Sequence, residues 1–178
     1  MLRLFLGIPL APEQALALST ICSGLHGVRW VDPGNFHVTI RFIGEVDEGV
    51  AADLDAEIAL LRAPKFALSV AGVDFFGPAE KPRAMIATLD REPGLHHLFD
   101  KLGTIMARVG LPLEYRRFTP HVTLAYCAKP NPAEILQFVA AHHLLRLDPF
   151  AVERFHLVRS YLTKAGSFYE DIATYRLV

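Results

Sequence analysis

The sequence predicts a single α+β domain built from two copies of a strand–helix–strand–helix–strand module. The tetrapeptide His-Val-Thr-aliphatic occurs at residues 37–40 and again at 121–124, both copies are typical of strands, and each is the second strand of its half. The halves are residues 1–77 and 83–178, joined by a loop around 77–82. We expect two lobes related by a pseudo-twofold axis, with mainly antiparallel sheets, a central cleft, and termini free to cross between lobes.

The first half supplies three strands and two helices. Proline is favoured in the first turn of a helix and glycine just past its end, and Asp47 is a suitable N-cap. Short apolar runs bounded by glycine or proline are typical of strands. The expected elements are strands over residues 2–8, 36–43 and 66–76, a helix from Pro12 that ends at Gly24 and Gly27, and a helix from Asp47 that stops before Pro64.

The second half repeats this order and adds a terminal hairpin. A helical period of apolar residues follows Pro93-Gly94 and ends at Gly110 and Pro112. A turn at residues 164–167 separates the last two strand-like segments. The expected elements are strands over residues 83–89, 121–127, 150–161 and 168–177, a helix from Pro93 to Gly110, and a shorter helix near 132–142.

Composition limits the range of partners. The chain has 178 residues, of which 52% are apolar, and a net charge of -1, so it can bury a substantial core but has no overall basic charge for long nucleic acid or anionic membranes. Cys22 and Cys127 match no disulfide or metal spacing and indicate a reducing compartment. No apolar run approaches the roughly 20 residues of a membrane span, and residues 2–8 are interpreted as a strand, not a signal peptide. We expect a cytoplasmic monomer.

The repeated tetrapeptide places polar side chains on one face of each strand. Residues i and i+2 of a strand point to the same side, so His37 shares a face with Thr39, and His121 shares a face with Thr123. If the two strands meet, two imidazoles and two hydroxyls surround one small cavity. The alternative interpretation is that these are core histidines and ordinary strand threonines. Their matching positions in a repeat favour a site.

Paired histidines suit acid–base chemistry on a phosphate. An imidazole titrates near pH 6.5, so one can be neutral while its partner is protonated. One takes a proton from the incoming water or hydroxyl, and the other protonates the departing alkoxide. Threonine hydroxyls can donate hydrogen bonds to the non-bridging oxygens. This reaction requires neither a metal nor a covalent intermediate, and neither strand offers metal ligands at short repeated spacing.

Two arginines are candidates for contacts with the phosphate. Arg41 lies four residues after His37, so alternation predicts that it shares the face of His37 and Thr39, although it also suits a surface position at the end of the strand. Arg116 and Arg117 precede the second histidine strand. They form a short basic segment beside His121 that suits a phosphate-rich substrate, or else they are part of a solvated loop.

The residues around both tetrapeptides resemble those of a known family. The matching segments are residues 3–8, residues 30–46 (Trp-Val-Asp-Pro-Gly-Asn-Phe-His-Val-Thr-Ile-Arg-Phe-Ile-Gly-Glu-Val), Arg116, Phe118, residues 120–125 and residues 160–169. The chain is similar to the two-histidine (2H) phosphoesterases. Within them it resembles most the RNA 2′,3′-cyclic phosphodiesterase branch, also called 2′-5′ RNA ligase-like.

The resemblance implies hydrolysis of an RNA 2′,3′-cyclic phosphate to a 2′-phosphomonoester, without a cofactor. It implies that His37 protonates the leaving 3′ oxygen, that His121 activates water, and that Thr39 and Thr123 hold the phosphate. The implied partner is an RNA 3′ end or a nucleotide that carries the cyclic phosphate. Some members join tRNA halves through a 2′-5′ linkage, with an RNA 5′-hydroxyl in place of water.

One position departs from the family pattern. The branch usually has Arg after the second motif, where this chain has Tyr126, so a phosphate-binding charge is missing there. Strand alternation points Tyr126 away from His121 unless the strand twists or bulges. This departure keeps open a nucleotide-binding module without turnover. An RNA end-joining ligase is a further alternative.

The aromatic side chain that stacks on the base is left open by the sequence. Phe5, Phe76 and Tyr161 are the candidates. Together with the phosphate contacts discussed above, the expected substrate-binding residues are Arg41, Arg116, Tyr126 and Phe5.

Overall fold

The computed structural model describes residues 1–178 and contains a strand-rich α+β fold. The strands are β1 (Leu2–Pro9), β2 (Val28–Trp30), β3 (His37–Val46), β4 (Phe66–Leu68), β5 (Val70–Phe76), β6 (Ala84–Leu89), β7 (His121–Cys127), β8 (Phe150–Val152), β9 (Arg154–Thr163) and β10 (Gly166–Arg176). The helices are α1 (Pro12–Ser19), α2 (Glu48–Ala59), α3 (Pro93–Arg108) and α4 (Pro132–His142), with a 3-10 turn η1 at Pro33–Asn35. The predicted α+β class is confirmed.

The main sheet is antiparallel and interleaves the two halves of the sequence. Its strand order is β10-β9-β1-β3-β7-β6-β5, and β2 pairs with β7 beside this path. The strands that carry the tetrapeptides, β3 and β7, are therefore neighbours at the centre. The C-terminal strands β9 and β10 extend the group of β1 and β3, whereas β4 and β8 form a separate small sheet.

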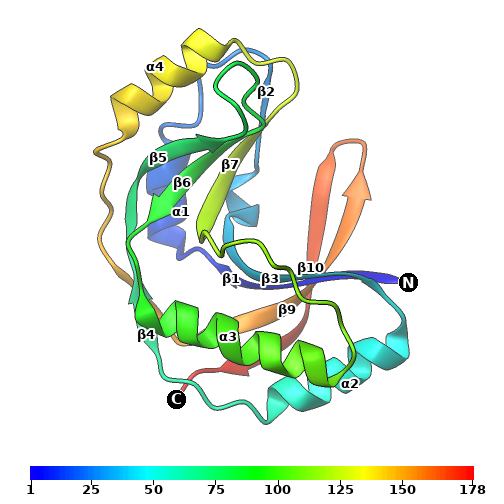
Figure 1. The fold of residues 1–178 in the computed structure, drawn as a ribbon. Helices are drawn as coiled ribbons and strands as arrows, with labels where there is room; N and C mark the ends of the chain where they lie inside the picture. The colour runs from blue at the N-terminus through cyan, green and yellow to red at the C-terminus, as the bar shows by residue number, and fades with distance from the viewer.

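Two strand groups diverge from the centre of the sheet. β3 and β7 pair through Val38 and Val122 alone, and Figure 1 shows the two groups spreading apart from this point. Helices α2 and α3 pack together against the β1–β3–β9–β10 group, and α4 packs against β5. The hydrophobic core fills the space between the helices and the sheet. The opposite faces of β3 and β7, which we call the cleft face, lie outside this core.

Several boundaries differ from the predicted ones. The first helix ends at Ser19 instead of near Gly24, and the strands expected at 66–76 and 150–161 are each broken once, at Ser69 and at Glu153. Strand β2 was not predicted, because three residues are too short to show a period.

The approach of β2 to β7 depends on a glycine. Gly27 has a φ of 71°, and a Cβ there would overlap the carbonyl of Lys129. The amides of Ala128 and Lys129 both donate to the Gly27 carbonyl at 3.0 Å. Only glycine suits both the left-handed conformation and this close contact.

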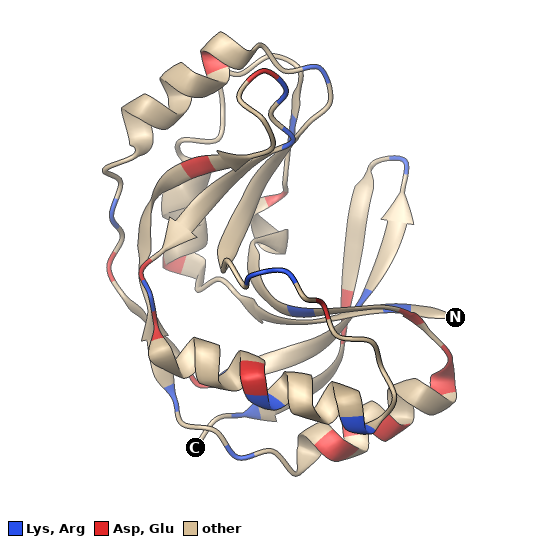
Figure 2. Ribbon diagram, in the orientation of Figure 1, with Lys and Arg blue, Asp and Glu red and all other residues tan.

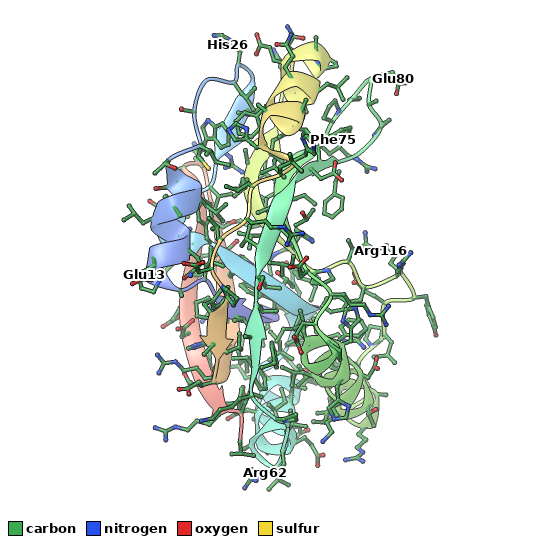
Figure 3. All side chains as sticks on the ribbon, turned by 90° about the vertical axis from the view of Figure 1, so that its left-hand side faces the viewer. Glu13, His26, Arg62, Phe75, Glu80 and Arg116 are labelled. Carbon is green, nitrogen blue, oxygen red and sulfur yellow. The ribbon has the colours of Figure 1, made fainter.

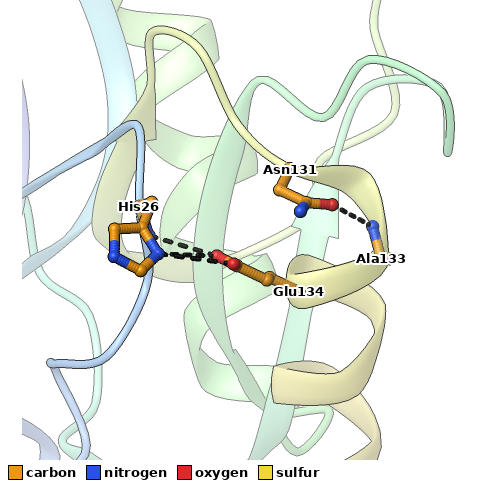
Figure 4. Close-up of polar contacts among 4 residues, drawn as sticks. All are labelled: His26, Asn131, Ala133 and Glu134. Atoms are coloured by element: carbon orange, nitrogen blue, oxygen red, sulfur yellow. Dashed lines mark hydrogen bonds and ion pairs between the residues drawn. The ribbon is translucent and has the colours of Figure 1, made fainter.

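The start of α4 is fixed to the loop that precedes β2 (Figure 4). The Asn131 side chain accepts a hydrogen bond from the Ala133 amide at 3.1 Å and so caps the helix. His26 Nδ1 lies 3.3 Å from the Glu134 carboxylate in the first turn. These contacts hold α4 beside the β2–β7 edge.

Charged residues of both signs are dispersed over the helices, the strands and the loops (Figure 2). Both cysteines, Cys22 and Cys127, are free. None of the helices combines the length and the apolar character needed to cross a membrane.

Candidate active site

The pairing of β3 with β7 brings the two tetrapeptides together. Val38 lies opposite Val122, so the antiparallel register places His37 opposite Thr123 and Thr39 opposite His121. Both valines are fully buried, whereas the histidines and threonines are half-buried on the other face. The face that the two strands share is the cleft face.

A β-bulge follows the threonine in both strands. On β3, Thr39 pairs with Gly7 and Arg41 pairs with Leu6, which leaves Ile40 unpaired. The bulge reverses the alternation beyond this point, so Ile40 and Arg41 both point to the buried face.

The bulge on β7 occupies the same place. Thr123 pairs with Ile86 and Ala125 pairs with Met85, which leaves Leu124 unpaired. Leu124 and Ala125 are both fully buried, and Tyr126 is turned to the cleft face. The bulge that Tyr126 needs in order to approach the histidine face is therefore present.

Backbone carbonyls fix the orientation of both imidazoles. His37 Nδ1 lies 2.8 Å from the Asn35 carbonyl, and His121 Nδ1 lies 2.7 Å from the Thr119 carbonyl. A carbonyl oxygen only accepts, so Nδ1 carries a hydrogen in each ring and Nε2 is the nitrogen left for proton transfer. His37 Nε2 lies 3.0 Å from the Thr39 hydroxyl.

Burial lowers the pKa of both histidines. Desolvation is the main cause for His37. The Asn35 carbonyl opposes it with a smaller upward effect on the pKa, and the nearby His121 adds a still smaller lowering. For His121, desolvation lowers the pKa and the Thr119 carbonyl opposes it. Both imidazoles therefore prefer the neutral form in the free protein.

Aromatic rings surround each histidine. The Phe5 ring lies 4.8 Å from the His37 ring, and the Tyr169 ring contacts both, at 5.2 Å from each. Phe76 meets His121 edge-on at 4.6 Å. Of the three aromatic candidates, Phe5 and Phe76 thus border the histidines. Tyr161 instead packs on the β9–β10 hairpin and donates to Glu170.

Arg41 does not lie where strand alternation places it. The bulge turns its side chain under α3, where Nε and Nη2 donate to the Phe99 carbonyl at 3.1 and 3.0 Å. Its Cζ lies 3.3 Å from the centroid of the Phe99 ring, and the residue is 9% exposed. Gly103 makes room for it, because a Cβ there would overlap the guanidinium. The prediction that Arg41 shares the face of His37 and Thr39 is therefore wrong.

The contacts of Arg116 do not include the histidines. It is exposed in the loop between α3 and β7, where Nη2 lies 2.9 Å from the Glu114 carboxylate (Figure 3). The structure therefore brings together His37, Thr39, His121, Thr123 and Phe5, whereas the side chain of Arg41 contacts Phe99 and that of Arg116 contacts Glu114.

Sequence reasoning missed the groups that support the histidines. Asn35 and Thr119 act through their backbone carbonyls, and any residue type can supply a carbonyl, so the sequence does not reveal this role. The one available signal is that each stands two residues before a repeated histidine. Tyr169 lies in the closing segment of the resemblance but shows no pattern that assigns it to His37. A cavity of about 270 Å³ opens beside this group and is lined in part by Phe5, His37, His156 and Tyr169.

Comparison with known proteins identifies the family. Residues 25–163 match the family model described as the 2′-5′ RNA ligase superfamily. The chain belongs to the 2′-5′ RNA ligase superfamily. The resemblance noted in the sequence is confirmed.

Two relatives match along most of the chain. A protein of Aeropyrum pernix named RNA 2′,3′-cyclic phosphodiesterase is 30% identical over 148 residues, which is 82% of this chain and 84% of the relative. A protein of the same name from Archaeoglobus fulgidus is 26% identical over 177 residues, 98% of this chain and 99% of its own.

Solved structures share the fold. A crystal structure of a Thermus thermophilus protein has a TM-score of 0.82 at 27% identity and covers 98% of this chain and 97% of that one. Escherichia coli LigT, solved in complex with 3′-AMP, has a TM-score of 0.79 at 24% identity, with 99% and 98% covered.

Proposed function

We propose that this chain is a phosphodiesterase that opens RNA 2′,3′-cyclic phosphates to 2′-phosphomonoesters. The observation that carries the proposal is the meeting of two His–Thr faces at the β3–β7 pair, with each imidazole oriented by a carbonyl. Relatives that match more than four-fifths of the chain are named RNA 2′,3′-cyclic phosphodiesterase, which supports the same reaction.

The two histidines divide the proton transfers. A water oxygen bonds to phosphorus while the bond from phosphorus to the 3′ oxygen breaks, so the phosphate stays on the 2′ oxygen. His121 Nε2 takes the proton of the water, and protonated His37 Nε2 gives its proton to the departing 3′ oxygen. One turnover leaves the proton on His121, and exchange with solvent restores the pair.

The threonines hold the phosphate in this proposal. Thr39 lies within hydrogen-bond distance of His37, and Thr123 occupies the equivalent place after His121. Their hydroxyls donate to the non-bridging oxygens, where negative charge increases in the transition state. Phe5 bounds the space beside His37 and provides an apolar wall for the nucleoside.

The substrate contributes to the reactive protonation state. Burial favours the neutral form of both imidazoles in the free protein. The bound phosphodiester brings a negative charge between them and so favours a proton on one. The proposed reaction uses no metal, and the proposed setting is a cytoplasmic monomer that acts on RNA 3′ ends.

A product assay tests the proposal. The purified protein is incubated, with EDTA present, with a short RNA that ends in a 2′,3′-cyclic phosphate, and phosphorus NMR follows the phosphate. We expect a 2′-monophosphate. A 3′-monophosphate would contradict the assigned leaving group, and intact substrate in the presence of folded protein would contradict the reaction.

A further inference from the structure

A second groove adjoins His37. It has a volume of about 710 Å³ and is lined by residues of the β2–β7 edge and of the β9–β10 hairpin. Its polar and aromatic lining comes mainly from Arg29, Asp32, Asn35, Tyr126, Phe168 and Tyr169. Asn35 and Tyr169 also contact His37, through a carbonyl and a ring respectively, so the groove and the histidine face share a wall.

Arg29 is an exposed cation without an anionic partner in this groove. It pairs with Tyr126 across β2 and β7, and its Cζ lies 5.5 Å from the centroid of the Tyr126 ring. None of the ion pairs in the chain includes Arg29. The Asp32 carboxylate, which also lines the groove, accepts from the Gly34 amide at 2.8 Å.

The position of Arg29 indicates which phosphate it can reach. Along the cleft face of β7 the order is His121, Thr123 and then Tyr126, because of the bulge at Leu124. Tyr126 and its partner Arg29 therefore lie about 7 Å beyond Thr123, one further repeat of the strand. In the proposed reaction the scissile phosphate lies between the histidines and threonines, so a guanidinium one strand repeat beyond Thr123 can reach a neighbouring phosphodiester of an RNA chain.

The aromatic lining suits unpaired bases. Tyr126 is 45% exposed and Phe168 is 60% exposed, on opposite walls of the groove. Exposed aromatic rings beside a cation are the usual means by which proteins bind single-stranded nucleic acid without reading its sequence. The net charge of -1 keeps such binding local.

We propose that this groove binds the penultimate nucleotide, the one that precedes the nucleoside carrying the cyclic phosphate, with Arg29 on the phosphodiester that joins the two and Tyr126 stacked on a base. This inference rests on the proposed function and adds a substrate class to it. The chain then acts on the ends of oligoribonucleotides in preference to free cyclic mononucleotides.

The test compares two substrates. We would measure kcat/KM for a triribonucleotide that ends in a 2′,3′-cyclic phosphate and for the matching 2′,3′-cyclic mononucleotide, and take their ratio. Loss of one charge-assisted hydrogen bond corresponds to about a tenfold effect, so Arg29→Gln should lower the ratio about tenfold. Arg62→Gln is the matched control, because Arg62 is an exposed arginine beyond α2, far from the groove (Figure 3). It should leave the ratio unchanged.

Salt dependence separates charge from stacking. Binding of a triribonucleotide that ends in a 2′-phosphate is titrated at several salt concentrations. Arg29→Gln should reduce the slope of log Kd against log salt by about 0.7, the value for one phosphate contact on a single strand. Tyr126→Ala should weaken binding about tenfold at every salt concentration and leave the slope as it is.

The outcomes are distinguishable. An equal loss on both substrates would mean that Arg29 acts on the scissile phosphate, and an unchanged ratio would mean that it contacts no RNA; either result overturns the inference. If the wild type turns over neither substrate, the proposed function fails. The binding titration then tests the groove independently of turnover. If Arg29→Gln leaves the slope of log Kd against log salt unaltered, this inference is overturned too.

Discussion

Val38 on β3 pairs with Val122 on β7, and this single residue pair joins the two tetrapeptide strands. Each valine has a histidine on one side and a threonine on the other, so one pair of backbone contacts sets the position of all four polar residues. The two strand groups diverge on either side of it. The geometry of the site therefore depends on how well two buried side chains pack.

Shortening one of these valines should affect rate as well as stability. Val122→Ala removes two methyl groups from a fully buried position and should lower the free energy of unfolding by about 2 kcal/mol. Because both histidines are positioned through this pair, kcat should also fall about tenfold. Denaturant unfolding and kinetics on the cyclic phosphate would measure the two effects.

Ile58→Ala provides the control, since Ile58 is buried on α2, away from the cleft. It should destabilise the fold at least as much and leave kcat unchanged at a temperature where the protein stays folded. A parallel loss of kcat in both variants would show that the effect is general.

Removal of either imidazole should abolish most of the activity. His37→Ala and His121→Ala should each lower kcat at least about a hundredfold, the lower end of a general acid–base contribution. Both side chains are half-buried on the cleft face, so the variants should remain folded by circular dichroism. Near-wild-type turnover in either variant would rule out the paired mechanism.

The dependence of kcat/KM on pH should be bell-shaped, with its maximum below pH 6.5. This parameter reports the free protein, in which the reactive state carries one proton on the histidine pair. Burial lowers the pKa of both histidines from 6.5. Above that range both imidazoles are neutral and the acid is lost, whereas below it both are protonated and the base is lost. A maximum above pH 7, or a flat profile, would contradict the site.

Arg41 should matter for stability. Arg41→Ala removes two hydrogen bonds from a charged group to the Phe99 carbonyl and should cost about 2–3 kcal/mol. Arg116→Ala, on the exposed loop, should change the free energy of unfolding by less than about 0.5 kcal/mol. Thermal and denaturant unfolding of both variants would test the contrast.

Gly103→Ala adds a second check on Arg41. Alanine normally stabilises a helix interior relative to glycine, by about 0.5–1 kcal/mol. Here the added Cβ would overlap the Arg41 guanidinium, so we expect destabilisation. Stabilisation would mean that the arginine moves away freely.

The sequence predicted the features that depend on strand alternation and on the residues that start and end helices. His37 and Thr39 precede the bulge on β3, and His121 and Thr123 precede the bulge on β7. The two-residue period of a strand therefore placed each pair on one face correctly. Arg41 and Tyr126 follow the bulges, and a bulge is visible only in the register with a neighbouring strand. That is why alternation assigned both to the opposite face from the one they occupy.

Long-range pairing accounts for the other differences. The predicted halves counted β9 and β10 with the second half of the chain and left the termini free to cross between lobes, and in the structure these strands extend β1 beside the first tetrapeptide strand. Tyr169 reaches His37 only through that pairing. Strand β2, which carries Arg29, has three residues and owes its place to the contact of Gly27 with the chain around Lys129.

The two bulges, at Ile40 and Leu124, have a consequence for the direction of the chemistry. Both histidine strands break their alternation at the same offset, and both imidazoles rest on the carbonyl two residues earlier. The backbone geometry around the two histidines is therefore alike. What distinguishes donor from acceptor is their surroundings, Phe5 and Tyr169 on one side and Phe76 on the other. In the proposed mechanism, the direction of bond cleavage then depends on how the nucleotide is seated between these two walls.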